Sequence, residues 1–312
     1  MSKQKFISSA EEIIDQARRI GRREKMRLGV ASAADRDVLA AVVEAKQEGM
    51  VEPILIGDVK KIQVIAGEQN LDLSGMELID IPAESRAAAK TAELAAKDEI
   101  QIVMKGFIQT STLLKTILKA EYGLRMRDTL SHSALMSIPE YHKLLNITDG
   151  GMVLEPTLEQ KISIIQNAAL VANALGIEKP KIALHSSTDY VLPELKSSLD
   201  CAILTQMGHR GQLGNIFIDG PLTLDTILIK ATAEATDFHS PVAGDADVLV
   251  VSSIDEGNII AKALVSFAGA VFSGVVVGAK VPISLVSRTD SSLNKKSSIA
   301  LAVILAQRIR KS

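Results

Sequence analysis

The sequence predicts an α/β protein built from two α/β lobes with largely parallel sheets. Short apolar segments alternate with longer segments in which apolar residues recur every three or four positions. This alternation is typical of βαβ units, in which a helix follows each strand of a parallel sheet. The alternation runs through the first half of the chain and begins again near the middle. We therefore expect two lobes.

The first half begins with a helix and continues with four strands. Ser9 and Glu12 form a capping box that opens the helix, and Gly21 is expected to end it. Gly49 is expected to end the next helix. The expected strands span 26–31, 51–56, 76–81 and 100–104, and further helices are expected around 84–96 and 110–120.

The second half repeats this pattern. Thr157 and Gln160 form another capping box, whose helix is expected to stop at Gly176. Strands are expected at 145–148, 181–185, 216–219 and 248–251, then a last strand at 283–286 and a helix to about Arg310. Because no low-complexity linker separates the halves, we expect the chain to cross between lobes more than once. The predicted domains are residues 1–137 with 282–312, and residues 138–281, with the active site in the cleft between them.

Composition excludes several classes of protein. The chain has 312 residues, of which 47% are hydrophobic and 23% charged, and its net charge is −2. It has neither the basic field nor the aromatic content of a nucleic-acid-binding protein. Only one cysteine is present, Cys201, and no signal peptide is apparent, so we expect a cytoplasmic protein. The uncharged run 263–279 is too short for a membrane span and predicts a buried helix followed by a loop or strand.

The turn after the last predicted strand has the composition of a phosphate site. Ser287 and Arg288 are followed by Asp290 and Ser291 at the start of the last helix. Unpaired N–H groups at a helix start favour anions, and the planar guanidinium matches phosphate. An ordinary strand-to-helix turn with a Ser/Thr cap is the alternative. Other polar clusters that follow predicted strands are Lys105-Gly106 and Asp219-Gly220.

An ordered set of motifs resembles the phosphate acetyl/butyryltransferase family. The resemblance covers roughly residues 100 to 305, and more loosely the whole chain. The motifs are Lys105-Gly106 with Thr110, 121–125, 131–135, 147–152, 156–161, Arg210-Gly211-Gln212, Asp219-Gly220-Pro221 with Asp225, 241–244, Glu256-Gly257-Asn258 with Lys262, and the segment from Ser287 to Ser291.

The resemblance implies reversible acyl transfer, in which acyl-CoA and phosphate give acyl phosphate and CoA. It also implies two α/β domains similar to isocitrate dehydrogenase, a homodimer, coenzyme A and phosphate as substrates, and no metal or permanently bound cofactor. The amino-acid sequences of segments 148–149, 210–212 and 287–291 resemble the butyryl branch of the family more than the acetyl branch.

The residues of the implied site are taken from the motifs. Ser287 and Arg288 would be catalytic, with Arg288 on the phosphate and Ser287 on the tetrahedral oxygen or the CoA sulfur. The five histidines show no metal-ligand spacing and are interpreted as structural or surface residues. The implied binding residues are Lys105, Gly106, Thr110, Arg210, Asp219, Gly220, Glu256, Gly257, Asn258, Lys262, Asp290 and Ser291.

Two departures keep alternatives open. Acetyltransferase members carry an Asp that deprotonates the CoA thiol at the position where this chain has Asn294. They also carry a substrate-binding Arg near the position of residues 265–266, where this chain has Val265 and Ser266 and no Arg. Asp290 is a candidate substitute base, although a helix N-cap is the preferred interpretation. The alternatives are a phosphate acetyltransferase and a catalytically weak homologue that binds CoA esters. A pyridine-nucleotide dehydrogenase is disfavoured because no G-x-G-x-x-G follows a strand.

Overall fold

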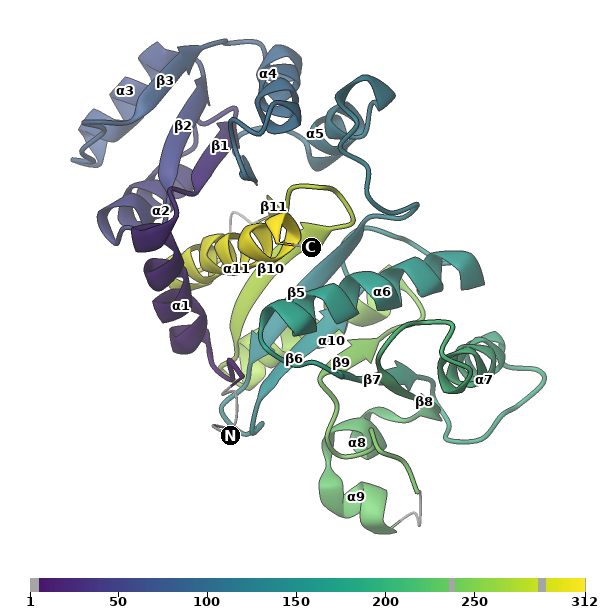
Figure 1. Ribbon diagram of the computed structural model, residues 1–312. Helices are drawn as coiled ribbons and strands as arrows, with labels where there is room; N and C mark the ends of the chain where they lie inside the picture. The colour runs from purple at the N-terminus through teal and green to yellow at the C-terminus, as the bar shows by residue number, and fades with distance from the viewer. Residues whose placement is uncertain (1–5, 236–238, 286–289, 312) are drawn as a thin grey trace. The chain divides into compact units, whose positions relative to one another are not determined.

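The computed structural model describes residues 6–235, 239–285 and 290–311 (Figure 1). Contacts between Cα atoms divide the chain into two compact units. The 10–127 unit consists of Ala10–Arg127 together with the chain from Ser273 onward, and the 128–272 unit consists of Asp128–Phe272 together with the residues that precede Ala10. The predicted boundaries at 137/138 and 281/282 remain a prediction about folding domains.

The sheet of the 10–127 unit has the strand order β3-β2-β1-β4-β11-β10. All neighbouring strands are parallel except β10 and β11, which run antiparallel. Apolar runs make these strands, and most of their residues are buried. The strands are β1 (Arg27–Ala31), β2 (Glu52–Gly57), β3 (Glu77–Asp80), β4 (Ile102–Lys105), β10 (Val271–Val277) and β11 (Ile283–Ser284).

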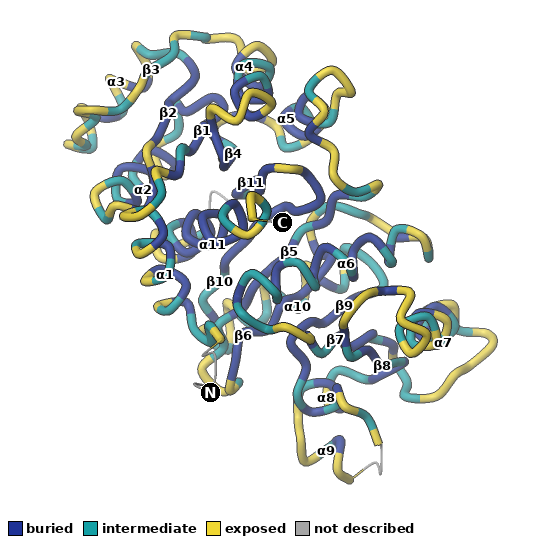
Figure 2. The backbone as a smooth tube through the Cα atoms, viewed as in Figure 1, coloured by how far each residue is buried: buried dark blue, intermediate teal, exposed yellow. Residues whose placement is uncertain are grey.

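Helices cover this sheet. Helix α11 packs on α1 and on α2, while α4 packs on α5 and β1 (Figure 1). Helix α11 is buried from Ile299 to Ala306, as the dark blue tube in Figure 2 shows. The helices are α1 (Ala10–Arg23), α2 (Arg36–Gln47), α3 (Val59–Glu68), α4 (Glu84–Ala96), α5 (Thr110–Ile117) and α11 (Ser292–Arg310), with a 3₁₀ turn at Ala120–Tyr122.

The sheet of the 128–272 unit has the order β5-β6-β9-β7-β8. Strand β5 is antiparallel to β6, and the other pairs are parallel. The strands are β5 (Ser131–Ser137), β6 (Leu144–Thr148), β7 (Lys181–His185), β8 (Phe217–Leu222) and β9 (Val248–Val250), and the helices are α6 (Leu158–Ala174), α7 (Lys196–His209), α8 (Leu224–Leu228), α9 (Lys230–Ala235) and α10 (Ile254–Phe267).

Two hydrophobic clusters cover opposite faces of this second sheet. One cluster joins α6 and α7 to the sheet through residues such as Ile165 and Leu204. The other joins α8 and α10 through residues such as Ile227 and Leu264. The helices that follow the neighbouring strands β6 and β9 therefore lie on opposite faces.

Most predicted elements are present, and several details differ. The Thr157/Gln160 capping box is present, with hydrogen bonds of 3.3 and 2.9 Å. Gly21 does not end α1, which continues to Arg23. A Cβ atom there would lie 2.2 Å from the carbonyl oxygen of Gly49, so this glycine permits close packing rather than ending the helix. Helix α5 ends at Ile117, before the predicted 120.

The uncharged run 263–279 forms the end of α10 and strand β10. The predicted helix and strand are confirmed, but the helix is not buried. Gly257 is its only buried residue, and Phe267 is 92% exposed. Within the described residues, no helix is both long enough and apolar enough to cross a bilayer.

Candidate active site

In the 10–127 unit, candidate residues lie where strands β1, β4 and β11 end. Lys105 is the last residue of β4 and is paired in register with Ala31, the last residue of β1. Strand β11 runs parallel to β4 on its other side, with Ser284 opposite Met104. The carboxyl ends of these parallel strands therefore share one edge of the sheet, where ligands bind in such folds.

Gly106 allows the chain to pass close to the end of β1. A Cβ atom at this position would lie 2.2 Å from the carbonyl oxygen of Ser32. The N–H of Gly106 donates to Ala31 and that of Phe107 donates to Ser32 (2.9 and 2.7 Å). Thr110 follows as the first residue of α5. A cavity of about 320 Å³ opens beside this turn and is lined by Ser32 and Phe107, among others.

The predicted catalytic residues Ser287 and Arg288 lie outside the described residues, which resume at Asp290. Ser291 is the N-cap of α11, and its hydroxyl accepts a hydrogen bond from the N–H of Asn294 at 3.1 Å. The preferred interpretation of Asp290 as the N-cap is therefore wrong, because the cap falls one residue later. Asn294 is 6% exposed.

Lys295 is a buried cation at this helix start that sequence analysis did not select. Its Nζ donates to the carbonyl of Asp290 at 2.5 Å and lies 3.6 Å from the carboxylate of Asp37. Its side chain is only 6% exposed. A lysine in a helix is usually at the surface, so the sequence offers no clear signal for it.

In the 128–272 unit, the turns after β6 and β9 touch each other. A Cβ atom on Gly257 would lie 2.7 Å from the Cα atom of Gly150, and the reverse contact is equally tight. Both positions therefore require glycine. The crevice between adjacent strands whose helices leave to opposite faces is where open α/β sheets bind ligands. The amide of Asn258 reaches the carbonyl of Gly150 at 3.5 Å.

Glu256 fixes the turn between β9 and α10. Its carboxylate accepts a hydrogen bond from the N–H of Ser252 at 2.6 Å, and the Nδ1 atom of His185 lies 3.2 Å from it. Burial alone would raise the pKa of Glu256, but His185 and the N–H of Ser252 outweigh that effect and lower the pKa. Glu256 is therefore ionised at neutral pH. His185 had been interpreted as structural or surface, and it lies against a predicted site residue.

Asp149 and His132 form a buried polar group beneath the turn after β6. Asp149 is 2% exposed and accepts hydrogen bonds from the N–H groups of His132, Gly151 and Met152 (3.1, 2.8 and 2.8 Å). Burial raises the pKa of Asp149 to about 6, although these bonds oppose the rise. Burial also lowers the pKa of His132 to about 4, and among the described residues its Nδ1 atom has no hydrogen-bond partner.

Three predicted binding residues lie away from these turns. Arg210 is exposed at the C-terminal end of α7. Because α7 runs back from the end of β7 toward the start of the parallel strand β8, Arg210 lies at the opposite edge of the sheet. Asp219 and Gly220 lie inside β8, two strands from β9. The Asp219 carboxylate accepts a hydrogen bond from the N–H of Gly220, which indicates a local structural role.

Lys262 is exposed on α10, one helical turn beyond Asn258. Its position on the same helix is compatible with a ligand that also touches the β9–α10 turn.

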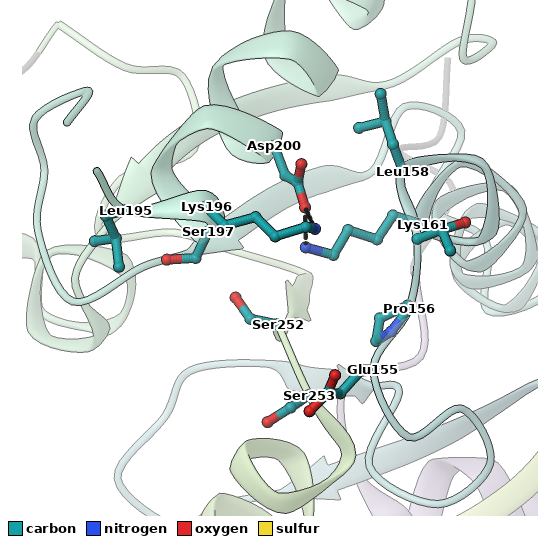
Figure 3. A pocket seen from close by; sticks show the side chains of 11 residues that line it. Glu155, Pro156, Leu158, Lys161, Leu195, Lys196, Ser197, Asp200, Ser252 and Ser253 are labelled. Atoms are coloured by element: carbon teal, nitrogen blue, oxygen red, sulfur yellow. Dashed lines mark hydrogen bonds and ion pairs between the residues drawn. The ribbon is translucent and has the colours of Figure 1, made fainter. Parts of the chain in front are cut away.

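A cavity of about 550 Å³ opens beside the β9–α10 turn (Figure 3). Ser252 and Ser253 form one side of it, and the beginnings of α6 and α7 form the others. Lys161 and Lys196 both reach Asp200 at its edge, as the dashed lines in Figure 3 show. Lys161 lies in one of the family motifs, at 156–161, and has no predicted role.

Comparison with known proteins identifies the family. The phosphate acetyl/butaryl transferase family matches residues 8–97 and 83–303 of the chain. The chain belongs to this family. A phosphate butyryltransferase from Clostridium acetobutylicum is 37% identical over 301 residues, which cover 96% of this chain and 99% of that protein. A phosphate acetyltransferase from Thermotoga maritima is 38% identical and covers 95% and 99% respectively.

A solved structure of the same kind agrees. The branched-chain phosphotransacylase from Enterococcus faecalis superimposes with a TM-score of 0.80 at 32% identity, covering 90% of this chain and 99% of that one. Relatives named phosphate butyryltransferase and relatives named phosphate acetyltransferase are thus identical to this chain to nearly the same degree, at 37% and 38%.

Within this member of the phosphate acetyl/butaryl transferase family, the predicted residues form two clusters, one in each unit. Lys295, His185 and Asp149 also belong to these clusters, although they were not among the predicted site residues. The cluster in the 10–127 unit contains Lys105, Gly106, Thr110, Asp290 and Ser291, and that in the 128–272 unit contains Glu256, Gly257, Asn258 and Lys262.

Proposed function

We propose that this protein catalyses the reversible transfer of a butyryl or branched short-chain acyl group between coenzyme A and inorganic phosphate. Membership of the phosphate acetyl/butaryl transferase family over nearly the whole chain carries this proposal. In the forward direction a phosphate oxygen attacks the thioester carbonyl, a tetrahedral intermediate forms, and the CoA thiolate leaves. CoA and phosphate supply both nucleophiles, so no covalent enzyme intermediate is needed.

The proposed roles follow the chemistry of each side chain. Arg288 holds the phosphate, and the N–H groups at the start of α11 assist it. Ser287 stabilises the tetrahedral oxygen or the departing sulfur. The buried ammonium of Lys295, which holds the carbonyl of Asp290, supports this by fixing the end of the same turn. Substrate is bound in the 10–127 unit by Lys105, Gly106, Thr110, Asp290 and Ser291. In the 128–272 unit it is bound by Glu256, Gly257, Asn258 and Lys262. Arg210, Asp219 and Gly220 support the fold of their own unit.

Asn294 stands where acetyltransferase members have the Asp that deprotonates the CoA thiol, and an asparagine cannot act as that base. A thiol with a cysteine-like pKa of about 8.5 is a few per cent ionised at neutral pH. Complete deprotonation by a base would then gain roughly 30-fold, or about 2 kcal/mol. Phosphate attacks as an anion without such help, so an asparagine at this position is compatible with turnover. The acyl preference for four carbons rests on the sequence of the 148–149, 210–212 and 287–291 segments.

The test is phosphate-dependent release of CoA thiol from acetyl-, propionyl-, butyryl- and isobutyryl-CoA. We expect kcat/KM to peak at the four-carbon substrates and Arg288→Ala to abolish it. Arg310→Ala is the matched control, because Arg310 is an exposed arginine at the far end of α11 that pairs with Asp98. A maximum with acetyl-CoA would replace the butyryl assignment. CoA binding without turnover of any substrate would instead favour a CoA-ester-binding homologue.

We also propose that the protein is a homodimer and is cytoplasmic. Helix α10 is apolar but leaves Ile259 and Phe267 67% and 92% exposed, which supports a surface covered by a second copy. Sedimentation of Phe267→Asp should show monomer. The control Val64→Asp changes a 59%-exposed valine on α3 and should leave the dimer intact.

Two observations support the proposed cytoplasmic location. The substrates are strongly charged and do not cross a bilayer unaided. The thiol of Cys201 is free and buried.

A further inference from the structure

His185 and Glu256 form a pair at the carboxyl edge of the sheet in the 128–272 unit. His185 is the last residue of β7, and β7 pairs in parallel with β9, which leads into the start of α10 and Glu256. The Nδ1 atom of His185 lies 3.2 Å from the Glu256 carboxylate. Ligands of open parallel sheets bind at this edge. A histidine beside an orienting carboxylate at such a place is typical of acid–base catalysis.

Contacts on both partners hold this pair in place. The N–H of Ser252 donates to the second carboxylate oxygen of Glu256 at 2.6 Å, so the carboxylate stays turned toward His185. The carbonyl of His185 accepts hydrogen bonds from the Cys201 thiol and the Ser252 hydroxyl, at 3.5 and 3.4 Å. The Nδ1 atom makes no aligned hydrogen bond in the described part of the chain, and catalytic hydrogen bonds often become aligned only when substrate binds.

The carboxylate decides which ring nitrogen can act as a base. A negative charge beside Nδ1 favours the tautomer that carries its proton there, so Nε2 keeps a free lone pair. The two nitrogens lie on opposite sides of the ring, and Nε2 therefore faces away from Glu256. The His185 side chain is 14% exposed, so the ring is not sealed in the protein. Once Nε2 has taken a proton, the charge of Glu256 stabilises the imidazolium.

Three other titratable groups near this edge suit proton transfer less well. Burial lowers the pKa of His132 to about 4, which makes it a weak base toward a thiol whose pKa is about 8.5. Asp149 is 2% exposed, and its carboxylate already accepts three backbone N–H groups. Burial raises the pKa of the Cys201 thiol to about 12, so this thiol stays protonated. Of the four groups, His185 combines access, an orienting partner and a free lone pair.

We propose that His185, oriented by Glu256, is the acid–base residue that moves the proton of the CoA thiol. This inference rests on the proposed function, and it fills the role that Asn294 cannot perform. When CoA attacks an acyl phosphate, Nε2 takes the S–H proton and the sulfur forms the C–S bond with the carbonyl carbon. The C–O bond to phosphate then breaks, and its electron pair leaves with the phosphate. In the opposite direction the imidazolium returns the proton to the thiolate as the C–S bond breaks.

Loss of this base should cause a defect that depends on pH. A thiol with a pKa of about 8.5 is about 3% ionised at pH 7 and about 90% ionised at pH 9.5. An enzyme without the base reacts only with the thiolate, so its defect shrinks as the thiol ionises by itself. The groups that face His185 keep their charge over this range: the pKa of Glu256 on α10 is lowered, and that of Cys201 on α7 is about 12. Strand β8 places the uncharged Leu222 opposite His185.

The experiment measures kcat/KM for CoA in the direction that forms butyryl-CoA, with saturating butyryl phosphate, from pH 7 to 9.5. His185→Asn places an amide nitrogen near the position of Nδ1, so it can still donate to Glu256 but has no basic nitrogen. His185→Gln is the second variant, with its amide nearer the position of Nε2. The control is His209→Asn, which changes an exposed histidine at the C-terminal end of α7 in the same unit.

We expect His185→Asn to lower kcat/KM about 30-fold at pH 7 and less than about twofold at pH 9.5. His185→Gln should follow the same course, and His209→Asn should match the wild type throughout. A loss that stays constant over this range would show that His185 only positions Glu256, and it would overturn the proposal, as would an unchanged kcat/KM. The pH-dependent loss appearing in Asp290→Asn instead of His185→Asn would overturn it too, because the base would then be Asp290.

Chemical rescue separates proton transfer from an effect on folding. In His185→Ala, added imidazole should restore activity in proportion to its concentration, whereas pyrazole, a ring of the same size and much weaker basicity, should not. Equal effects of the two rings would overturn the proposal. The wild type tests the proposed function separately. If it forms butyryl-CoA and the His185 variants lack the expected pH dependence, the inference fails and the function stands. If it forms no acyl-CoA from any acyl phosphate, both fail.

Discussion

Asp149 and His132 should give the stability of this protein two opposing pH dependences. Burial raises the pKa of Asp149 from 3.8 to about 6, so the folded protein keeps a proton that the unfolded chain releases between these values. Its contribution to stability is therefore present at low pH and is lost as pH rises through 6. Burial lowers the pKa of His132 from 6.5 to about 4, so its contribution is present above 6.5 and is lost as pH falls toward 4.

The two effects are similar in size. Each pKa unit corresponds to about 1.4 kcal/mol, so shifts of roughly two units correspond to about 3 kcal/mol each. Their slopes nearly cancel in the wild type between about pH 4 and 6.5. Removing either group should expose the other slope. In Asp149→Asn the free energy of unfolding should fall by about 3 kcal/mol as pH is lowered through this range, and in His132→Leu it should fall by a similar amount as pH is raised.

Urea unfolding at half-unit intervals of pH gives the measurement. The readout is the difference in slope from the wild type, because other titrating groups contribute equally to all three proteins. Asp149→Asn also places an amide N–H₂ against the N–H of His132, which lowers its stability at every pH but does not change its slope. Curves parallel to the wild type in both variants would refute the burial argument for this pair.

Three further predictions concern backbone and cap positions. Gly21→Ala should destabilise the protein by about 1–3 kcal/mol, because its Cβ atom would lie 2.2 Å from a carbonyl oxygen. Gly67→Ala, which has open space around it, should stabilise α3 by up to about 1 kcal/mol. Urea unfolding should therefore show changes in unfolding free energy of opposite sign for the two variants, and equal changes would contradict this prediction. Gly257→Ala should separate the turns after β6 and β9 and raise KM for acyl-CoA severalfold, which steady-state kinetics would show; unaltered kinetics would mean that the contact with Gly150 is not needed. Ser291→Ala removes the cap of α11 and should cost about 1 kcal/mol, with Ser291→Asp restoring it in thermal unfolding; failure of Asp to restore stability would argue against a capping role.

The sequence predicts elements whose residues all favour one structure. The strand at 181–185 was predicted at its observed bounds because it is a short, strongly apolar run between polar residues. Strand β5 was not predicted, because Ser131-His132-Ser133 carries three polar residues in its first half. Those residues are tolerated because the Ser133 hydroxyl and the carbonyl of His132 have partners on β6, in Asn146 and Thr148. Such long-range partners cannot be read from one strand.

The candidate site was predicted best where a motif follows a strand. Lys105-Gly106 and Glu256-Gly257-Asn258 lie at the carboxyl edges of their sheets, as the rule for parallel sheets requires. Arg210 follows a helix instead, which puts it at the other edge. Lys295 was missed because its burial depends on α2 and on the turn before α11, neither of which its own neighbours in sequence reveal.

The path of the chain has a consequence for the order in which the protein is completed during synthesis. Strands β1 to β4 are translated before the residues from Asp128 to Phe272, but their sheet continues with β11, and the buried helix α11 belongs to the same unit. Both β11 and α11 are translated after Phe272. The 128–272 unit has nearly all of its residues by then, including the Ile7 backbone contact to Leu175 from the start of the chain. The 10–127 unit therefore cannot be completed until β11 and α11 have been translated, and until then aggregation or chaperone binding competes with its folding.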